Sequence, residues 1–533
     1  MAAEGTTMDR IVALCKRRGF IFQSSEIYGG INGFWDYGPL GVELKRNIKD
    51  AWWNDMVRNP PIGPDGREVQ MVGIDCAIIM NPKVWEASGH VGGFADPMQT
   101  CRQCKRLYRA DQVWELLKES EWLKSFATAF SHGGEPDRIR VEGAKLLAWA
   151  KTKGRKVAPG LALVRNPEVT LSSLAERIER GEEFDLISIV QHAATEQYGQ
   201  TGLQTPCPNC GGDLTEPRQF NLMFESHAGA VRDEENKVYL RPETAQGIFV
   251  NFPNVLNTTR VRIPFGIAQI GKAFRNEINP RNYTFRSREF EQMEIEFFCH
   301  DREAMMWWEW WRDVRIDWYR SLGLRSDHLR PRNQTDRELA HYSRACTDIE
   351  YLFPFSDEPQ ELEGVAHRGC FDLTQHQKHS GRDMSYFDDE TRERFVPTVI
   401  EPSAGADRAA LAFICEAYTV DENRPSPELM RFHPRLAPIK AAVFPLVNKD
   451  GLPEIARPIY EEIRKVYPAQ YDAKASIGKR YARMDEAGTP FCFTIDGQTR
   501  EDNTVTVRDR DTGHQIRIDK SRCLEYLREH LKP

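Results

Sequence analysis

One stretch of this chain, residues 274–298, constrains the fold more than any other. It reads FRNEINPRNYTFRSREFEQMEIEFF and ends in an alternating run from Phe290 to Phe298. Alternation of apolar and polar residues is typical of a β-strand with one buried face. The residues expected to face a core are Met293, Ile295 and Phe297, and those expected to face the other side are Gln292, Glu294 and Glu296. We therefore predict two antiparallel strands joined by a loop that carries Arg281, Arg286 and Arg288.

The charged residues of this stretch suggest a chemistry. Arg275 and Glu277 stand two positions apart, which predicts one shared strand face. Arginine binds phosphate through paired donors, and the acids beyond the loop can accept an ammonium group or a metal ion. The stretch thus favours a site for a nucleotide and an amino acid. A solvated strand face with surface ion pairs is the alternative for each residue taken alone.

Composition narrows the class of protein. The chain has 533 residues, enough for two to four domains, with 40% hydrophobic residues and a formal net charge of −7. A mildly acidic chain is not built to coat nucleic acid nonspecifically, although local basic patches can hold one such partner. No apolar run is long enough to cross a membrane, and the first residues do not resemble a secretory signal. We expect a soluble cytoplasmic enzyme with no membrane partner.

The pattern along the chain predicts four segments: residues 1–100, 101–210, 211–432 and 436–533. Residues 303–322 are tryptophan-rich and helical in period. Residues 421–438 hold four prolines, which is typical of a linker. Beyond them, short strand-like runs alternate with helical ones over about 100 residues, which predicts a separate domain with a sheet and flanking helices.

Two further motifs place a charged residue directly before an apolar segment. EPSAGADR, residues 401–408, precedes an apolar helical run, and Arg408 stands where the helix dipole disfavours a cation. A phosphate partner explains that placement, and an exposed first-turn arginine is the alternative. RPETAQGIF, residues 241–249, places Glu243 before an apolar segment. A helix N-terminal acid, which the dipole favours, is the simpler interpretation of Glu243 alone.

The chain has twelve cysteines, too few for a disulfide scaffold of this length. Four of them form two pairs, Cys101 with Cys104 and Cys207 with Cys210, in polar, turn-like surroundings. Two such knuckles suit tetrahedral Zn²⁺, and four protein ligands indicate a structural rather than a catalytic ion. The segment between the pairs is far longer than in a compact zinc ribbon, so we interpret it as a helical insertion flanked by the knuckles. Free thiols and a redox dithiol are the alternatives.

Together these motifs resemble those of the class II aminoacyl-tRNA synthetases, and among them the homodimeric glycine-specific type. FWDYGPLGVELK, residues 34–45, is similar to motif 1, the dimer-interface element of that class. Residues 274–298 look like motif 2 and residues 401–408 like motif 3. RPETAQGIF and ELEGVAHRGCFDL resemble stretches particular to the glycine enzymes. The resemblance runs from Met8 to about Ile518 and is weakest in residues 112–200.

The resemblance implies an α+β fold: a class II antiparallel sheet with helices, a zinc-knuckle-flanked helical insertion and a C-terminal α/β anticodon-binding domain. It also implies roles for matching residues. The catalytic residues would be Arg275, Arg408 and Glu294. ATP would be bound by Arg275, Asn276, Glu277, Phe285, Arg286, Ser287, Arg288, Glu289, Phe290, Glu361, Leu362, Gly405, Ala406, Asp407 and Arg408. Glycine would be bound by Arg109, Glu243, Phe290, Glu291, Gln292, Met293, Glu294, Glu401, Pro402, Ser403, Ala404 and Gly405.

The implied function is that of a glycine–tRNA ligase. Glycine and ATP would form glycyl-adenylate and pyrophosphate, with Mg²⁺ as cofactor, and the glycyl group would pass to the 3′ end of the tRNA. We expect a homodimer with a structural zinc ion. Three alternatives stay open: a zinc-ribbon nucleic-acid-binding protein without catalysis, a synthetase of the same class for threonine or proline, and an adenylating ligase for small molecules.

Overall fold

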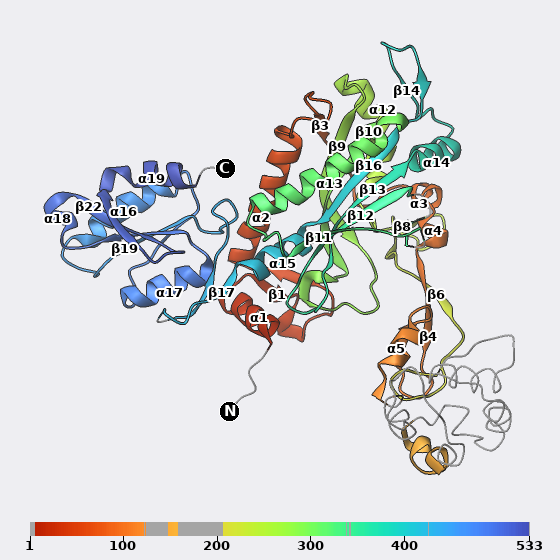
Figure 1. Ribbon diagram of the computed structural model, residues 1–533, viewed down its shortest axis with the longest axis horizontal. Coiled ribbons are helices and arrows are strands. Elements are labelled where there is room, and N and C mark those ends of the chain that lie inside the picture. Colours follow the sequence, from red (N-terminus) through yellow and green to blue (C-terminus); the bar gives the residue numbers. More distant parts are fainter. Residues whose placement is uncertain are drawn as a thin grey trace. The chain divides into compact units, whose positions relative to one another are not determined.

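A computed structural model describes residues 6–121, 123, 148–157, 206–336, 338–340, 343–424 and 426–531 (Figure 1). The chain separates into two compact units. One unit combines residues 1–91 with residues 223–533, and the other comprises residues 92–222. Each is described by itself below. The expected helical insertion lies largely outside the described residues, which include α5 (Val113–Lys118), a π-helical turn (Ala150–Gly154) and α8 (Arg155–Val157).

A seven-stranded sheet forms the centre of the first unit, with strand order β11-β12-β13-β16-β10-β9-β3. Its strands are β3 (Gln70–Gly73), β9 (Phe265–Phe274), β10 (Glu289–Cys299), β11 (Leu329–Asn333), β12 (Ala345–Tyr351), β13 (Gln360–Gly369) and β16 (Thr398–Gly405). All neighbours are antiparallel except β3 and β9, which are parallel. The expected antiparallel sheet therefore has one parallel edge.

Strands β9 and β10 are the two antiparallel strands that the alternating stretch predicts, with Phe274 opposite Glu289 and Glu294 opposite Gln269. One expectation is wrong: β9 ends at Phe274, so Arg275 and Glu277 lie in the connecting loop and share no strand face. The N–H of Glu277 donates to the carbonyl of Arg275 at 2.6 Å in a tight turn. The arginine loop thus begins at Arg275, three residues earlier than a strand that extends to Glu277 would place it.

Both faces of β10 are buried. Met293, Ile295 and Phe297 pack into a core with α13 (Ala304–Ser321) and α15 (Ala406–Ala417), and Figure 1 shows α13 along this side of the sheet. The other face is covered by α12 (Ala245–Thr259) and α14 (Phe371–Ser380), whose apolar residues pack around Phe298. The strand is therefore not half-solvated, and its three polar residues at 292, 294 and 296 are buried.

The remaining elements of this unit frame the sheet. They are α1 (Thr7–Arg18), β1 (Ile21–Gln23), β2 (Trp35–Tyr37), α2 (Pro39–Trp53), α3 (Pro82–Ala87), β7 (Glu225–His227), β8 (Lys237–Tyr239), β14 (Tyr386–Phe387) and β15 (Arg394–Phe395). Pro39 at the first helical position of α2 needs no hydrogen-bonded N–H there. Gly41 packs against the carbonyl of Phe20, where a Cβ would lie 1.8 Å from the oxygen. This close contact holds α2 against the residue that leads into β1.

The C-terminal part contains a five-stranded mixed sheet with order β20-β19-β21-β22-β23. Its strands are β19 (Ala441–Pro445), β20 (Ala469–Tyr471), β21 (Phe491–Ile495), β22 (Thr504–Asp509) and β23 (Gln515–Asp519). Helices α16 (Leu452–Ile463) and α19 (Cys523–His530) cover one apolar face, and α17 (Ile477–Ala487) covers the other. The short α18 (Thr499–Asp502) precedes β22. Alternating strands and helices in the sequence predict this arrangement.

The proline-rich segment 421–438 is folded, although its composition is typical of a linker. Strands β17 (Tyr418–Val420) and β18 (Glu428–Met430) form a hairpin at its start. Phe432, Leu436 and Ala437 are buried in the main core. Prolines here shape turns between packed residues, a role that composition cannot distinguish from a spacer.

The second unit has a small three-stranded sheet with order β5-β4-β6. Its strands are β4 (Ala95–Thr100), β5 (Leu107–Arg109) and β6 (Arg218–Asn221).

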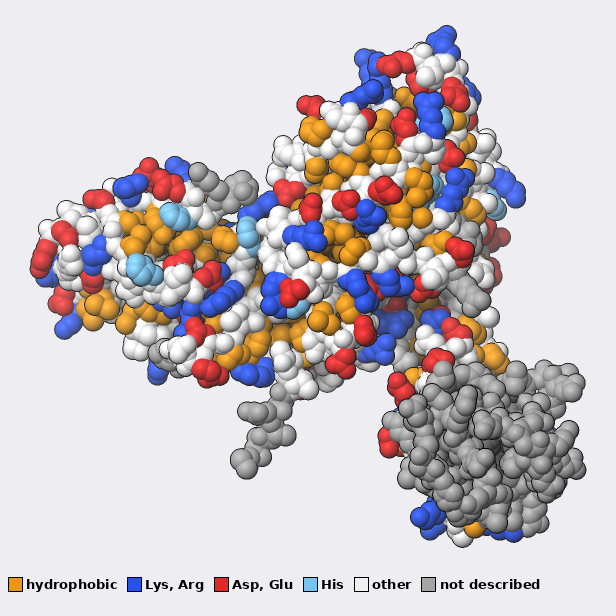
Figure 2. All heavy atoms as spheres, viewed as in Figure 1, with side chains coloured by type: hydrophobic (Ala, Val, Ile, Leu, Met, Phe, Trp, Pro, Cys, Tyr) orange, Lys and Arg blue, Asp and Glu red, His pale blue; other side chains and the backbone are white. Residues whose placement is uncertain are grey.

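On the face drawn in Figure 2, cationic and anionic side chains are interspersed over the described surface, in keeping with the small net charge. Among the described helices, none combines the length and apolarity that crossing a membrane requires.

Candidate active site

A pocket opens between the arginine loop, the start of β13 and the junction of β16 with α15. The residues that line it are Arg275, Glu277, Thr284, Phe285, Arg286, Ser287, Phe290, Gln292, Glu361, Leu362, Gly364, Ser403, Gly405, Asp407 and Arg408. Neighbouring strands bring these segments together, since Gln292 is opposite Gly405 and Gly364 is opposite Ser403. Thirteen of the sequence-predicted site residues therefore share one cavity.

Two contacts hold the side chain of Arg275 in place. Its Nε donates to the carbonyl of Pro242 at 3.0 Å, and its guanidinium carbon lies 5.4 Å from the ring centre of Phe290. The N–H of Arg275 donates to the carbonyl of Arg288 across the base of the loop. A guanidinium oriented in this way presents a directed cation to the pocket, as phosphate recognition requires.

Glu277 organises the arginine loop. Its carboxylate accepts from Nε of Arg286 at 2.9 Å, and its carbonyl accepts from Nε of Arg288 at 2.8 Å. Arg288 also donates to the carbonyl of Asn32 at 2.9 Å and does not line the pocket. Arg286 and Glu277 thus reach the cavity as an ion pair, while Arg288 ties the loop to the segment before β2.

Aromatic rings and a guanidinium form the opposite wall. Phe285 contacts Phe353 and Phe355 edge to face, each at 5.1 Å between ring centres. Arg408 lies over Phe285, with 4.6 Å between its guanidinium carbon and the ring centre. It also donates to the carbonyl of Glu361 at 2.9 Å. A planar base can stack on such a surface, because both the ring and the guanidinium offer flat faces.

Buried acids lie deeper, beyond Gln292. Glu294 accepts from the hydroxyl of Ser403 at 2.7 Å and from the hydroxyl of Thr244, and it is 1% exposed. The N–H of Thr244 donates to Oε1 of Gln292 at 3.1 Å. Burial and the nearby carboxylate of Glu243 raise the pKa of Glu294. This is an anionic pocket that a small cation can neutralise.

Two further acids complete that pocket. Glu401 accepts from Nη1 of Arg368 at 3.0 Å, and the same guanidinium binds Asp372 through two bonds of 2.9 Å. Glu243 accepts from Gln246 at 2.9 Å and lies 3.4 Å from Nε2 of His90. Burial opposes the ionisation of Glu243, but His90 and Arg368 lower its pKa. Burial raises the pKa of Glu401 to about 8, against the opposing effect of Arg368.

A second ionic network lies behind the pocket. Lys45 of α2 contacts Asp407 at 2.7 Å and Glu291 at 3.1 Å, and Lys49 contacts Glu291 at 2.9 Å. Oδ2 of Asp407 also accepts from the backbone N–H of Glu291 at 2.6 Å. Burial opposes ionisation of both partners, yet Lys45 lowers the pKa of Asp407 and Asp407 raises that of Lys45. One lysine thereby joins α2, β10 and α15.

Some predicted residues point elsewhere. The side chains of Met293, Ala404 and Ala406 pack in the hydrophobic core because they alternate with the pocket residues along their elements. Glu289 pairs with Lys272, and Glu291 pairs with the two lysines of α2. Arg109 lies in the second unit, where it pairs with Asp96 at 3.0 Å and Asp111 at 2.9 Å. Neither Asn276 nor Pro402 lines the cavity.

The structure adds residues that motif comparison did not single out. They are Lys45, His90, Thr244, Gln246, Arg368 and Asp372. Five of them stand inside quoted motifs: Lys45 ends FWDYGPLGVELK, Thr244 and Gln246 lie in RPETAQGIF, and Arg368 and Asp372 lie in ELEGVAHRGCFDL. Arg368 is the only arginine of its motif and follows the apolar pair Val365 and Ala366 on β13, which is the signal that could have identified it.

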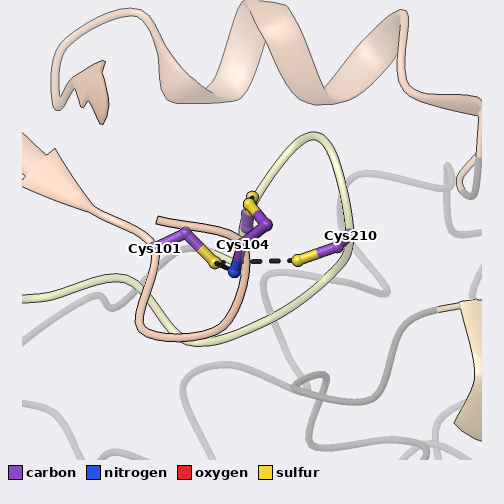
Figure 3. Close-up of side chains that lie close together, drawn as sticks. Cys101, Cys104 and Cys210 are labelled. Atoms are coloured by element: carbon purple, nitrogen blue, oxygen red, sulfur yellow. Dashed lines mark hydrogen bonds between the residues drawn. The ribbon is translucent and has the colours of Figure 1, made fainter. Parts of the chain in front are cut away.

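The two cysteine pairs converge in the second unit. The sulfur of Cys101 lies 3.6 Å from that of Cys210 (Figure 3). The sulfur of Cys104 lies 3.6 Å from that of Cys207. All four sulfurs lie within 4.8 Å of one another. A disulfide requires about 2.05 Å, whereas tetrahedral Zn–S bonds of about 2.3 Å separate sulfurs by about 3.8 Å. These distances suit four ligands around one ion.

Two family profiles match this chain. Residues 224–418 match the class II tRNA synthetase core domain (G, H, P, S and T), and residues 440–530 match an anticodon-binding domain. The first match includes the arginine loop and the strands that form the pocket. The second spans the five-stranded C-terminal sheet and its helices.

Curated relatives match over nearly their whole length. A glycine–tRNA ligase of Rhodopirellula baltica is 49% identical over 98% of this chain and 99% of its own. A glycine–tRNA ligase of Geobacillus thermodenitrificans is 47% identical over 96% of this chain and 95% of its own. A third, from Acetivibrio thermocellus, is 47% identical over 98% of both chains.

Proposed function

This chain belongs to the glycine–tRNA ligase family, and from that premise we propose how its pocket performs the reaction. The chain is a ligase that activates glycine with ATP and transfers it to the 3′ end of its tRNA. The observation that carries the proposed site is the junction of two environments on neighbouring strands. An arginine and aromatic pocket extends to Gln292 and Ser403, and a buried cluster of acids lies beyond them.

ATP occupies the arginine and aromatic side. The base stacks on Phe285, and Glu277 accepts from its amino group. Arg275 binds the α-phosphate, supported by its fixed contacts to Pro242 and Phe290. Arg408 binds the γ-phosphate. Its guanidinium, which donates to the carbonyl of Glu361 in this structure, then donates to phosphate oxygens instead.

Mg²⁺ accompanies the nucleotide. The carboxylate of Glu361, which lies beside Arg408 on the pocket lining, would offer this ion a hard oxygen donor of the kind that it prefers. When bound, the ion neutralises the charge that develops on the phosphates.

Glycine occupies the acidic side, with its ammonium held by Glu243, Glu294 and Glu401 through charge-assisted hydrogen bonds. Ser403 and Gln292 stand between the two sides and orient the carboxylate. The enclosing residues are buried, so a larger side chain has no room, and selection rests on exclusion of added bulk. For this reason we propose that the enzyme needs no editing site.

The glycine carboxylate attacks the α-phosphate in line, and pyrophosphate leaves. No side-chain nucleophile takes part, because the reaction depends on positioning and charge neutralisation. The 3′-terminal ribose hydroxyl of the tRNA then attacks the adenylate carbonyl, and AMP leaves. Arg275 stabilises charge on the α-phosphate during the first step, which makes it the residue with the largest expected effect on rate.

We propose that the four cysteines hold a structural Zn²⁺. The convergence of two distant pairs at tetrahedral spacing supports this proposal. With four protein ligands, the ion supplies folding energy to the second unit and no Lewis acid chemistry.

The remaining partners follow from the same assignment. Residues 436–533 bind the anticodon, residues 101–210 form the insertion, and residues 1–100 and 211–432 form the catalytic core. We propose a homodimer, supported by the similarity of residues 34–45 to motif 1 and by exposed apolar side chains nearby at Ile27, Tyr28 and Ile31. Since charging of tRNA serves translation, we propose a cytoplasmic location.

One experiment tests the proposed specificity. Pyrophosphate exchange is measured with a panel of amino acids that includes glycine, alanine, serine, threonine and proline. Exchange with glycine alone is the expected result. Comparable exchange with alanine or serine would contradict selection by exclusion, because each carries a side chain that glycine lacks.

A further inference from the structure

Glu296 is a buried carboxylate that the reaction as described does not use. It stands on β10, two residues beyond Glu294, and its side chain is fully buried. Among the described residues, neither of its oxygens has a hydrogen-bond partner. A buried carboxylate without a donor is costly when charged, so a cation or a proton must accompany it.

Its closest polar neighbours are themselves acids. Carboxylate oxygens of Glu294, Glu296 and Glu401 lie within 4.8 Å of one another. The charged groups that face Glu296 are Glu401 on β16, Arg368 on β13, Glu294 on β10 and Asp372 on α14. Negative groups outnumber the single guanidinium in this set.

The donors in this cluster are already directed at other acids. Arg368 donates to Glu401 and Asp372, and the hydroxyls of Ser403 and Thr244 donate to Glu294. Glu296 is also the deepest acid on its strand. Gln292 lines the pocket, Glu294 follows it, and Glu296 lies about 7 Å further along β10. The substrate ammonium therefore meets Glu294 before it could reach Glu296.

We propose that Glu296 is a positioning residue that remains a neutral carboxylic acid beneath the glycine site and donates its proton to an oxygen of Glu401. The inference rests on the proposed assignment of the ammonium to Glu243, Glu294 and Glu401. The proton is placed on Glu296 rather than on Glu401 because only Glu401 receives guanidinium hydrogen bonds. A neutral donor fixes the orientation of Glu401 and avoids a further repelling charge.

The electrostatics of the site agree with this placement. Burial and then the carboxylate of Glu401 raise the pKa of Glu296 well above its ordinary value. Because the folded-state pKa is raised, the stabilisation from this proton is complete below the unfolded pKa. It is lost as pH rises through the folded pKa. Alkaline pH should thus weaken the glycine site before it affects the arginine side.

The test compares three variants of the full-length chain in glycine-dependent pyrophosphate exchange. Glu296→Gln keeps a neutral donor of the same shape and should hold the KM for glycine within about threefold of the wild-type value. Glu296→Ala removes the donor and should raise that KM about tenfold or more, with the KM for ATP little changed. Glu294→Gln removes a proposed ammonium ligand and should also raise the KM for glycine about tenfold or more.

A spectroscopic measurement reads the proton directly. The infrared difference spectrum of wild type minus Glu296→Gln, recorded near pH 7 on protein with ¹³C-labelled glutamate, should contain a protonated carboxyl band. The band should disappear from the wild type at alkaline pH. The KM for glycine in Glu296→Gln should rise less with pH than in the wild type.

Each contrary result is distinct. A Glu296→Gln enzyme that loses glycine affinity as severely as Glu294→Gln would show that Glu296 is charged, and would overturn the inference. So would the absence of a protonated carboxyl band, or Mn²⁺ binding without ATP that Glu296→Gln abolishes. If instead Glu294→Gln left the KM for glycine unchanged, the proposed glycine site would fail, while the infrared band would still decide the state of Glu296. Should Glu296→Ala not fold, Glu296→Gln and the spectrum suffice.

Discussion

The ammonium of Lys45 lies 2.7 Å from Oδ1 of Asp407, across 362 positions of sequence. Asp407 precedes Arg408 directly, and its other oxygen accepts the N–H of Glu291. The helix that resembles motif 1 is thus bonded to the elements that resemble motifs 2 and 3. A contact behind the pocket holds two of its walls in register.

Replacement of Lys45 by methionine should therefore impair both stability and rate. The side chain of Asp407 is 9% exposed, and leaving such a carboxylate unpaired costs about 3–5 kcal/mol of unfolding free energy. We expect lower kcat in pyrophosphate exchange, because Arg408 and Glu291 lose their common anchor. Lys49→Met is the matched control, since Lys49 contacts only Glu291 of this network and is more exposed. Equal effects of the two substitutions would contradict the role given to Lys45.

The same pair predicts a pH dependence of stability. Lys45 lowers the pKa of Asp407 in the folded state, against the effect of burial, so the carboxylate stabilises the fold above its ordinary pKa of 3.8. That stabilisation is lost as pH falls through the lowered value. The melting temperature of the wild type should therefore fall as the pH drops from about 5 to below 3. The fall should be smaller in Lys45→Met, and identical slopes in calorimetry would refute the assignment.

Arg275 should be the most sensitive residue of the nucleotide side. Arg275→Ala removes the directed guanidinium and should lower the rate of pyrophosphate exchange about 100-fold, equivalent to about 3 kcal/mol of transition-state stabilisation. Arg275→Lys should recover little, because an ammonium cannot donate as a planar fork. Arg262→Ala serves as control, since Arg262 is exposed and pairs with Glu390. Normal exchange by Arg275→Ala would exclude its proposed role.

The cysteine cluster predicts a metal content. Elemental analysis should find about one zinc per chain, and the double substitution Cys101→Ser and Cys207→Ser should abolish it. Loss of the ion should lower the melting temperature of the second unit, because structural zinc contributes to folding. Cys370→Ser should retain the metal, since Cys370 belongs to the first unit, at the start of α14, and is not a member of the cluster. Zinc-free wild-type protein with an unchanged melting curve would count against a structural ion.

Removal of the C-terminal domain should separate the two half-reactions. The cut belongs after Ile439, because Phe432, Leu436 and Ala437 are buried in the main core. Stacking of a single base contributes about 1–3 kcal/mol, so kcat/KM for tRNA should fall about tenfold or more. Glycine-dependent pyrophosphate exchange should persist. Circular dichroism establishes that the fragment is folded, and parallel loss of both activities in a folded fragment would refute the assignment.

Several features of the fold could be predicted from residues alone. The alternation of Met293, Ile295 and Phe297 with polar residues predicts β10 and its core-facing side, because side chains on a strand alternate in direction. The tryptophan-rich period predicts α13, and the two CxxC pairs predict a common cluster. The strand and the helix follow from local backbone geometry, and the cysteine cluster follows from the specific chemistry of thiolate ligands.

Other features depended on contacts that no local pattern encodes. The polar face of β10 is covered by α12 and α14, which converts Glu294 and Glu296 from surface acids into buried ones. The sequence also did not predict that β9 ends at Phe274 or that residues 421–438 are folded. Whether a side chain is buried depends on the residues that pack against it. For Glu294 and Glu296 those residues lie in α12 and α14, far away in the sequence.

The sequence by itself determined the strands of the site, the identity of the charged groups and the family to which the chain belongs. Only the tertiary structure decided which charges meet. Arg368 is held by Glu401 and Asp372, Lys45 is held by Asp407, and Glu296 is left without a donor among the described residues. The reason is physical: the ionisation of a carboxylate depends on its solvation and on its neighbours within a few ångströms, and both are set by folding.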